Sequence, residues 1–395
     1  MLNRRDLLKQ AGAGAALFGI VAAAHAEPNL KAASAVPSKW DETYDVVVVG
    51  SGGAGMAAAV KAADQGSKVV VLERLAFPGG NTQLAQGQIN AADPVRQPKQ
   101  GIKDSPKLHA KQTLEAGDFR GNPERVRVLC ENAYGAITWL ESLGMEFEDT
   151  VFQMFGGLYP RAHSPKMVKG QGYIKVLLKA LADRKVPIVK NVRVTDIIRD
   201  TPESGDVRGV RVETKDGIKY IRARQGVVLA AGGFSANKYL RELHDPRVAG
   251  LGTDNLPNKT AGDVMMAAVR VGGYLVGMDF IQSTPGAPAG KKMKIILNTR
   301  VAESIYVDKR GNRIVDEGTR RDVIRGTPER YAYTVVDNDT YQKYNAAVHK
   351  SVEEGIKINE AWTAPTLKEL AVKMGVDPEG LEKGVARYNS FVEKG

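Results

Sequence analysis

A glycine-rich turn and an acidic residue that follows it are the first residues of this chain whose types and spacing suggest chemistry. Gly50, Gly52 and Gly55 form the pattern G-x-G-x-x-G, and Glu73 lies further along. Glycines so spaced allow a tight turn, close approach of a pyrophosphate, and close packing of a helix on a strand. A carboxylate placed like Glu73 accepts hydrogen bonds from a ribose diol. The pattern predicts a dinucleotide site with contacts from Gly50, Ser51, Gly52, Gly53, Ala54, Gly55, Glu73 and Arg74.

Two strands and a helix have to position this turn. Residues 44–49 are largely β-branched and predict a buried parallel strand, residues 56–65 predict an Ala-rich helix, and residues 69–72 predict a second strand. The amino end of such a helix offers free N–H groups and a partial positive charge to phosphates. Strand, glycines, helix, strand and acid follow in the order of a nucleotide-binding βαβ unit, so we expect an α/β fold.

A second glycine-rich segment, residues 79–92, comes shortly after Glu73 and reads GGNTQLAQGQINAA. It resembles the GGN[ST]xxAxGGxNAA signature of the fumarate reductase/succinate dehydrogenase flavoprotein superfamily, and is similar there to periplasmic flavocytochrome c fumarate reductases and urocanate reductases. The resemblance implies FAD and a Rossmann-like FAD-binding domain with an inserted α+β capping domain. It also implies contacts near the flavin and its phosphates from Gly79, Gly80, Asn81, Thr82, Gln83, Gly87 and Gln88. Gln88 stands where the family often has a glycine.

Three later segments resemble further FAD-binding elements of the family. Residues 226–234 resemble a buried strand, VxLA[AT]GGF, which implies contacts from Ala230, Ala231 and Gly232. The family places an adenine-contacting backbone at Val194. Residues 260–263 resemble a TGDG turn shifted by one residue, which implies Asp263.

The region expected to carry the reaction begins near residue 281, where family members insert a mobile capping domain. The family's His-Pro-Thr motif reads Gln282-Ser283-Thr284-Pro285 here, and its Thr-Glu-x-x-Arg motif keeps only Arg300. Residues 319–322 resemble the TTRD motif, which puts Arg321 on the active-site arginine. The resemblance implies hydride transfer from reduced flavin to a C=C bond. Arg321 would then be the proton donor, or would act by charge stabilisation and by gripping a carboxylate.

Glu303 and His163 are two further candidate residues for this site. Leu297 occupies the position of the family's relay glutamate, and Glu303 is the nearest replacement in the sequence. His163 lies in residues 155–165, expected to be a loop, which resembles the family's GG…RAHRP segment near the flavin. A structural role and a substrate-binding role are both open for His163.

The departures from the family pattern bear on the substrate. The histidine and the threonine that hold a fumarate carboxylate in the family are not at their expected places. We therefore expect a substrate other than fumarate, such as an acrylate, cinnamate or urocanate type. Two other readings stay open: a flavin-dependent dehydrogenase that desaturates its substrate, as ketosteroid dehydrogenases do, and a non-catalytic flavin-binding protein.

Composition limits the partners. Cys130 is the single cysteine among 395 residues, which excludes an intrachain disulfide, a thiolate zinc cluster and a C-x-x-C-H haem site. No metal site is expected, and the resemblance then implies that electrons come from a c-type cytochrome on a separate chain. The net charge of +11 could attract nucleic acid, but no Lys/Arg run interleaved with aromatic residues is present.

Residues 1–26 are typical of an export signal. Arg4 and Arg5 precede an apolar run at 11–24 that is too short to span a bilayer, and a small-x-small site follows at 24–26. The segment resembles the twin-arginine signal, so we expect a periplasmic protein. We further expect an FAD-binding domain at 41–280 and a capping domain at 281–395.

Homologues continue past the last residue of this sequence, with a segment that returns to the FAD-binding domain. We expect either a truncated record or a second polypeptide that completes the site. On that expectation the chain alone binds FAD poorly and does not turn over.

Overall fold

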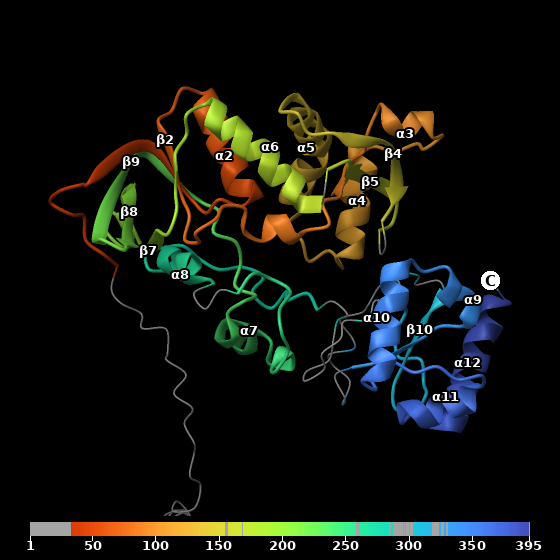
Figure 1. Cartoon of the computed structure of the whole chain (residues 1–395). Coiled ribbons are helices and arrows are strands. Elements are labelled where there is room, and N and C mark those ends of the chain that lie inside the picture. The colour runs from red at the N-terminus through yellow and green to blue at the C-terminus, as the bar shows by residue number, and fades with distance from the viewer. Residues whose placement is uncertain are drawn as a thin grey trace, which may run out of the picture. The chain divides into compact units, whose positions relative to one another are not determined.

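A six-stranded mixed sheet carries the predicted βαβ unit at its centre. The computed structural model describes residues 33–154, 157–167, 169–257, 261–283, 303–317 and 331–394, and positions 286, 295, 297, 300, 324 and 328. The predicted export signal lies outside these residues. The strands follow the order β6 (Ile188–Val189), β2 (Val69–Leu72), β1 (Glu42–Val49), β9 (Gly217–Leu229), β8 (Val207–Thr214), β7 (Arg193–Arg199). Figure 1 labels β2, β9, β8 and β7 of this sheet. Strands β6, β2, β1 and β9 are parallel, whereas β9, β8 and β7 pair antiparallel.

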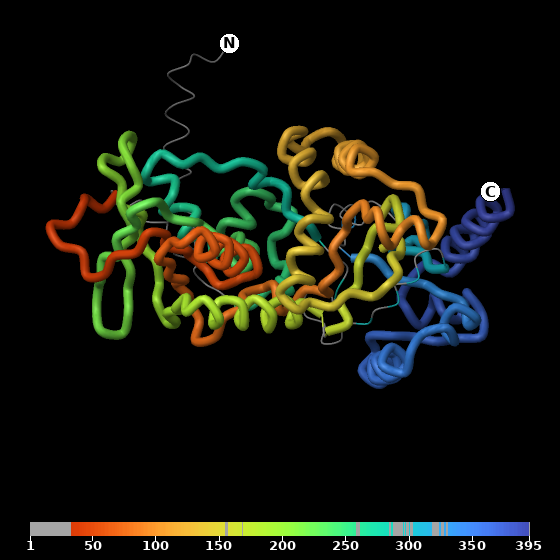
Figure 2. Tube along the Cα trace, turned by 90° about the horizontal axis from the view of Figure 1, so that it is seen from above, coloured from red at the N-terminus to blue at the C-terminus, as the bar shows by residue number. Residues whose placement is uncertain are grey.

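Alternating side chains of the central strands fill two cores. Val48 and Val71 point to one face, where they join the core formed with three helices, α2 (Gly53–Asp64), α5 (Pro123–Ser142) and α6 (Lys169–Asp183). Val47 and Val70 point to the other face and pack with valines of β7 and β8. Figure 2 shows α2 lying alongside α6. Burial on both faces explains why residues 44–49 read as an apolar run without polar alternation.

The predicted helical stretch 105–145 forms two helices. α4 (Pro106–Ala116) begins at the N-cap Ser105, and α5 begins at Asn122, whose side chain accepts a hydrogen bond from the N–H of Arg125. Pro at the first helical position suits both starts, because its missing N–H has no partner there anyway. Between them Asp118 and Phe119 have φ of 50° and 55°, which ends the first helix.

The strand predictions around residue 225 need a correction. Residues 218–223 and 226–234 were expected as separate strands, the second one buried, but Gly217–Leu229 form one strand, β9. β8 pairs with β9 only between Gly217 and Arg222, whereas β1 pairs with it as far as Leu229. Among the described residues the last part of β9 therefore has a neighbour on one side only, and Leu229 is 46% exposed.

A three-stranded sheet of order β3-β5-β4 follows the second glycine-rich segment. It contains β3 (Ile89–Asn90), β5 (Pro160–Pro165) and β4 (Phe147–Gln153), all antiparallel neighbours. Residues 155–165 were expected to be a loop, and that prediction is wrong for 160–165. The pairing with two strands supplies hydrogen bonds that the local sequence does not reveal. The short helices here are η1 (Gly80–Leu84) and α3 (Arg96–Lys99); α7 (Lys238–His244), η2 (Pro246–Val248) and α8 (Asp263–Val269) follow the main sheet.

The C-terminal part has its own core. Ile305, Val307 and Leu381 pack with apolar residues of the last helices. The elements are β10 (Ile305–Val307), β11 (Tyr333–Val335), α9 (Asn338–Gln342), α10 (Ala346–Lys357), α11 (Leu367–Met374) and α12 (Pro378–Val392). β10 pairs with β11, and Arg313 forms a single bridge with Val307. Helices α11 and α12 begin at the N-caps Thr366 and Asp377.

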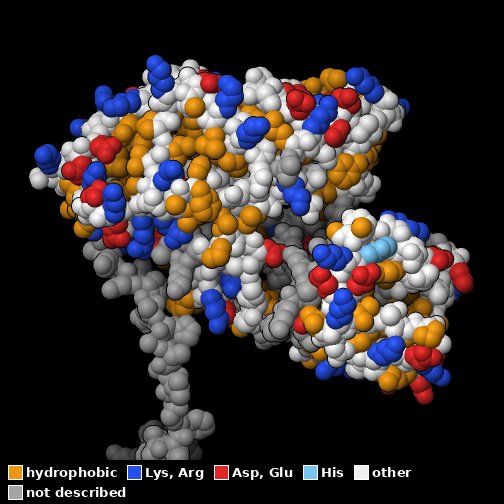
Figure 3. Space-filling view, viewed as in Figure 1, with side chains coloured by type: hydrophobic (Ala, Val, Ile, Leu, Met, Phe, Trp, Pro, Cys, Tyr) orange, Lys and Arg blue, Asp and Glu red, His pale blue; other side chains and the backbone are white. Residues whose placement is uncertain are grey.

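The surface carries charges of both signs. On the face drawn in Figure 3, Lys and Arg side chains are spread among Asp and Glu. Through the described ranges, no helix has both the length and the apolar character needed to cross a membrane.

Candidate cofactor site

A cleft opens where three parallel strands end. Val49 of β1 is paired with Leu72 of β2 and with Leu229 of β9, so the three carboxyl ends lie at one edge of the sheet. Ligands of open α/β sheets bind at this edge. The cleft has a volume of about 260 Å³. Its lining includes the predicted residues Gly50, Ser51, Gly52, Gly53, Ala54, Glu73, Arg74, Gly80, Asn81, Thr82, Val194, Ala230, Ala231, Gly232 and Asp263.

The three glycines of the turn have different structural reasons. A Cβ on Gly50 would lie 2.4 Å from the Ala230 carbonyl oxygen, and φ there is +102°. A Cβ on Gly55 would lie 2.0 Å from the Gly50 carbonyl oxygen, so helix and strand can approach only without it. At Gly52 the nearest atom is Thr82 Oγ1 at 3.7 Å, which leaves this backbone open toward the cleft. Gly52 is also the N-cap of α2, and as a glycine it has no side chain of its own to cap that helix end.

Glu73 is buried and held from two sides. Its Oε2 accepts hydrogen bonds from the Ser51 N–H at 3.0 Å and the Ser51 hydroxyl at 2.5 Å, and its Oε1 accepts one from the Leu75 N–H at 2.7 Å. An ionised carboxylate has about four acceptor positions. Glu73 therefore keeps capacity for one more donor on the side where it lines the cleft.

The segment that starts at Gly79 closes over the turn. Thr82 Oγ1 accepts a hydrogen bond from the Gly53 N–H at 2.9 Å, and Asn81 Oδ1 accepts one from the Leu256 N–H at 2.8 Å. The Gly79 N–H donates to the Ser51 carbonyl at 3.0 Å. These bonds fix the 79–82 backbone against the amino end of α2.

Five predicted cofactor contacts do not line the cleft: Gly55, Gly79, Gln83, Gly87 and Gln88. Gln83 donates from Nε2 to the Gly80 carbonyl at 3.1 Å, and a Cβ on Gly87 would meet Lys169 backbone at 2.9 Å. These residues shape the loop. Gln88 Oε1 is buried, and no partner for it occurs among the described residues.

Sequence reasoning found only Val194 and Asp263 at the far end of the cleft. Other residues there line it as well: Val192, Arg193, Leu256, Ala261, Gly262, Val264 and Met265. The Val192 N–H donates to the Glu73 carbonyl at 2.9 Å, which places the start of β7 beside the acid. Arg193 Nη2 is 2.5 Å from Asp263 Oδ2, and this hydrogen bond is the main cause that raises the pKa of Arg193. The apolar and arginine residues carry no local motif, so only the strand register could have indicated them.

These residues fit FAD. The amino end of α2 suits a pyrophosphate, Glu73 suits a ribose diol, and the open glycines suit a close ligand. A Cβ on Gly232 or on Gly233 would meet nothing within 4 Å, so the second glycine pair also leaves room for one.

Residues 45–395 match the family described as FAD binding domain. The chain belongs to this family. FAD is therefore its cofactor, and the predicted Rossmann-like fold agrees with solved structures. The chain aligns over its whole length with the open conformation of a flavocytochrome c3 fumarate reductase, with a TM-score of 0.70, 26% identity and 65% of that chain covered.

Relatives with named activities reduce unsaturated acids. The chain is 33% identical over 369 residues to "Fumarate reductase (cytochrome)" of Shewanella frigidimarina, covering 92% of this chain and 63% of the relative. It is 31% identical over 378 residues to a urocanate reductase of Eggerthella lenta, covering 92% and 62%. An acrylate reductase flavoprotein subunit of Shewanella woodyi is 29% identical, with 100% and 80% covered. The chain thus spans about three fifths of the length of the first two relatives.

A dehydrogenase shares the same fold. 3-Ketosteroid-Δ4-(5α)-dehydrogenase from Rhodococcus jostii aligns with a TM-score of 0.74 and 28% identity, covering 90% of this chain and 79% of that one. Proteins of this fold therefore include reductases that saturate a C=C bond and dehydrogenases that introduce one.

Of the predicted substrate and catalytic residues, Thr284 and Arg321 lie outside the described residues, and Gln282 is exposed. Arg300 is described, and its Nη2 is 2.7 Å from Glu303 Oε1. Glu303 Oε2 also accepts a hydrogen bond from Lys343 Nζ at 2.8 Å. The hydrogen bond from Arg300, and then that from Lys343, lower the pKa of Glu303 to about 2. Glu303 is thus an ionised partner of Arg300.

His163 is fully buried in β5 and both its ring nitrogens have partners. Nε2 is 2.9 Å from Asp93 Oδ2, and Nδ1 is 2.9 Å from the Arg161 carbonyl oxygen. Asp93 is also bonded to Arg96. This arrangement leaves neither nitrogen for a substrate and contradicts the prediction that His163 binds it. The ring joins β5 to the segment after β3, so its role is structural.

Proposed function

We propose that this chain is the FAD-binding part of an ene reductase that saturates the C=C bond of an unsaturated carboxylate other than fumarate. The supporting observation is the joint presence of the FAD cleft and of relatives named as fumarate, urocanate and acrylate reductases. The three named substrates share a double bond conjugated to a carboxylate.

FAD, when bound and reduced, supplies a hydride to one carbon of such a bond. The protein has to orient the substrate and provide a proton for the other carbon. We assign Arg321 to the proton donation or charge stabilisation, and Arg300 with Glu303 to its support. A guanidinium grips a carboxylate with two parallel hydrogen bonds, which suits substrate orientation.

The Arg300–Glu303–Lys343 group supports this assignment. Leu297, three residues before Arg300, cannot ionise. Glu303, three residues after Arg300, supplies the carboxylate that pairs with it. Lys343 adds a second cation to the same carboxylate at 2.8 Å. An acid and a base in hydrogen-bond contact can pass a proton between them.

Substrate choice is tested with the chain expressed together with any sequence that follows it in its gene. Reduced viologen would serve as electron donor for fumarate, acrylate, cinnamate and urocanate. We expect the highest kcat/KM with one of the last three. Fumarate as the best substrate would contradict the proposal.

The desaturating alternative is favoured by the likeness to the ketosteroid dehydrogenase. Arg321→Ala separates the two functions, because the reductase is expected to lose most of its kcat and a dehydrogenase of the ketosteroid type is not. Arg320→Ala is the adjacent control. If neither reduction nor desaturation of any tested compound occurs although FAD is bound, the non-catalytic reading gains support.

The remaining proposals concern organisation and location. The separate cores before and after residue 303 support an FAD-binding domain at 41–280 and a capping domain at 281–395. We also propose export by the segment 1–26 to the periplasm, and electron supply by a c-type cytochrome on a separate chain. Arg4→Lys with Arg5→Lys should retain the protein in the cytoplasm, as immunoblots of cell fractions would show.

A further inference from the structure

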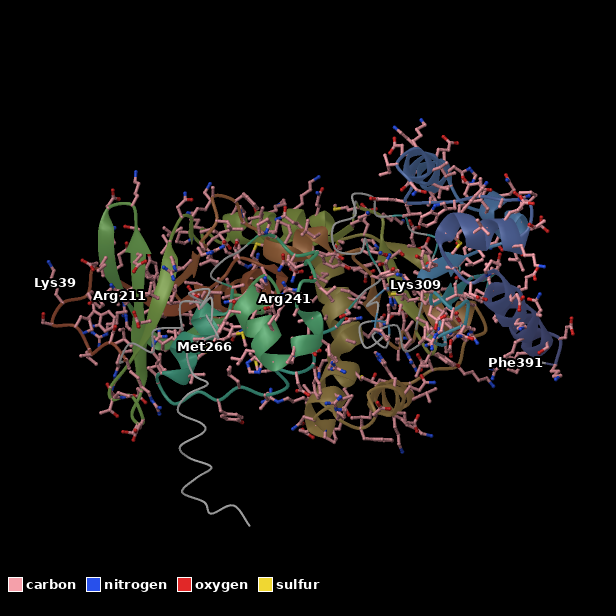
Figure 4. All side chains as sticks on the ribbon, turned by 90° about the horizontal axis from the view of Figure 1, so that it is seen from below. Lys39, Arg211, Arg241, Met266, Lys309 and Phe391 are labelled. Atoms are coloured by element: carbon pink, nitrogen blue, oxygen red, sulfur yellow. The ribbon has the colours of Figure 1, made fainter. Side chains whose placement is uncertain are left out.

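Arg193 occupies a particular place in the cleft. It is the first residue of β7 and lies between Val192 and Val194, and all three line the cleft near the segment 261–265. Arg193 is paired in register with Glu213 of β8, and Asp263 begins α8. Figure 4 shows the two flanking elements, with Arg211 labelled on β8 and Met266 labelled on α8.

The nitrogen atoms of the Arg193 guanidinium are paired with carboxylates or buried. Nη2 is 2.5 Å from Asp263 Oδ2, and Nη1 is 3.3 Å from Glu213 Oε2. Nε is buried, and it has no hydrogen-bond partner among the described residues. The side chain is nevertheless 42% exposed. Nη1 and Nη2 are each held by a carboxylate and Nε is buried, so the guanidinium is fixed in place while part of the side chain stays open to a ligand.

The charge of Arg193 is already compensated. Asp263 and Glu213 face this guanidinium, and Glu213 is shared with Arg211, so little net charge remains to attract the phosphates of a nucleotide. A guanidinium plane also stacks on aromatic rings and on nucleic-acid bases, independently of its hydrogen bonds. An arginine whose edge is fixed by two elements loses little freedom when a ring lies on it.

We propose that the face of the Arg193 guanidinium is the platform on which the adenine ring of FAD stacks, with Asp263 and Glu213 as the residues that position it. This inference rests on the assignment of FAD to the cleft. It gives Asp263 a different role from the one expected, because its carboxylate acts on the cofactor through Arg193.

ADP is the probe that tests this role, because it needs only the adenine end of the cleft. Isothermal titration with ADP, FAD and FMN, on the chain expressed with any sequence that follows it in its gene, would compare wild type with Arg193→Ala and Arg193→Lys. We expect both variants to bind ADP and FAD about tenfold more weakly and FMN unchanged. Lysine keeps the charge and lacks the plane, so wild-type affinity of Arg193→Lys would overturn stacking, as would wild-type affinity of Arg193→Ala.

Asp263→Asn gives a test of opposite sign. If Arg193 acted on ADP only through its charge, removal of the neighbouring negative charge would make ADP bind more tightly. A stacking Arg193 would lose its positioning, so we expect weaker binding, and tighter binding would overturn the inference. Arg208→Ala is the control, since Arg208 of β8 pairs with Asp200 and Asp206 and does not line the cleft. Equal loss in Arg208→Ala would show a general effect on the sheet and refute the specific role.

A wild-type chain that binds neither ADP nor FAD would overturn the FAD assignment itself. Wild-type ADP binding with unchanged variants would overturn only the role of Arg193. Thermal melts of each variant establish that a loss of affinity is not a loss of folding.

Discussion

Ser51 and Glu73 are joined by two hydrogen bonds, one from the serine N–H at 3.0 Å and one from its hydroxyl at 2.5 Å. They come from the ends of two neighbouring strands, β1 and β2. The contact ties the glycine-rich turn, which we expect to bind phosphate, to Glu73, which we expect to bind ribose. Such preorganisation reduces the entropy lost on binding.

Glu73→Ala should weaken binding of FAD and of ADP by about 10- to 100-fold, because a charged acceptor for the ribose is lost. Ser51→Ala leaves the carboxylate in place with two of its three described donors, so its effect should be several-fold smaller. Fluorescence titration with FAD measures both. A larger loss in Ser51→Ala than in Glu73→Ala would contradict this ranking.

Gly55→Ala should destabilise the protein by about 3 kcal/mol or prevent folding, because the new methyl group would lie 2.0 Å from the Gly50 carbonyl oxygen. Gly135→Ala is the matched control. It lies inside α5 with nothing within 4 Å of the added Cβ, and should stabilise by about 1 kcal/mol. Urea unfolding followed by circular dichroism compares them, and equal effects would contradict the packing argument.

His163→Gln should lower stability by about 1–3 kcal/mol, because the buried Asp93 carboxylate loses a hydrogen bond. The KM of whichever substrate is identified should stay near the wild-type value, since no ring nitrogen faces a ligand. Thermal unfolding and steady-state kinetics test the two parts. A raised KM with unchanged stability would restore the substrate-binding role.

Acid should destabilise the protein through Asp104. Burial alone would raise the pKa of this carboxyl, but hydrogen bonds from Arg161 and Gln97 outweigh burial and lower it. A carboxyl whose pKa is lowered in the folded state stabilises the fold at pH values above its unfolded-state pKa, which is near 3.9. That contribution disappears as the pH falls through the folded-state pKa.

Asp104→Asn should therefore be less stable near pH 7 and show a flatter decline of unfolding free energy below about pH 4. Urea unfolding between pH 7 and pH 3 measures it. Asp149→Asn, on an exposed position of β4, is the control and should follow the wild-type curve. Parallel curves for Asp104→Asn and wild type would show that this carboxyl is not responsible.

Glu303→Gln tests the pair with Arg300. With its pKa lowered to about 2 by Arg300 and Lys343, Glu303 is ionised above about pH 3, so the wild-type rate should show no titration of this group between pH 4 and pH 7. Removing the charge should lower kcat by about 10²-fold if it supports proton transfer. Lys350→Gln, on the exposed side of α10, is the control. An unchanged kcat would remove Glu303 from the mechanism.

The sequence predicted the parts of the fold that local rules determine. The strand 69–72 was correct to the residue. The N-caps Asn122, Thr366 and Asp377 show the same local chemistry in the structure, because each side chain accepts a hydrogen bond from the first turn of its helix. Nonlocal pairing was harder, because β5 depends on partners that lie far away in the sequence. The strand character of residues 160–165 was accordingly missed.

The same division holds for the site. Gly50 and Glu73 belong to a pattern whose chemistry is local, and both line the cleft. Arg193 belongs to no motif and reaches the cleft because β7 starts beside Glu73. His163 shows the opposite error. Its imidazole is a group that could bind a substrate, but strand pairing buries it and both ring nitrogens have partners in the protein.

The pairing of β1 with β9 sets the order of events during synthesis. The floor of the cleft forms only when Val49 pairs with Leu229. The glycine-rich turn and Glu73 therefore leave the ribosome long before β9 does. Contacts of such sequence separation slow folding, and they leave an unpaired parallel strand exposed in the meantime. The complete floor of the cleft can therefore form only after translation has passed β9.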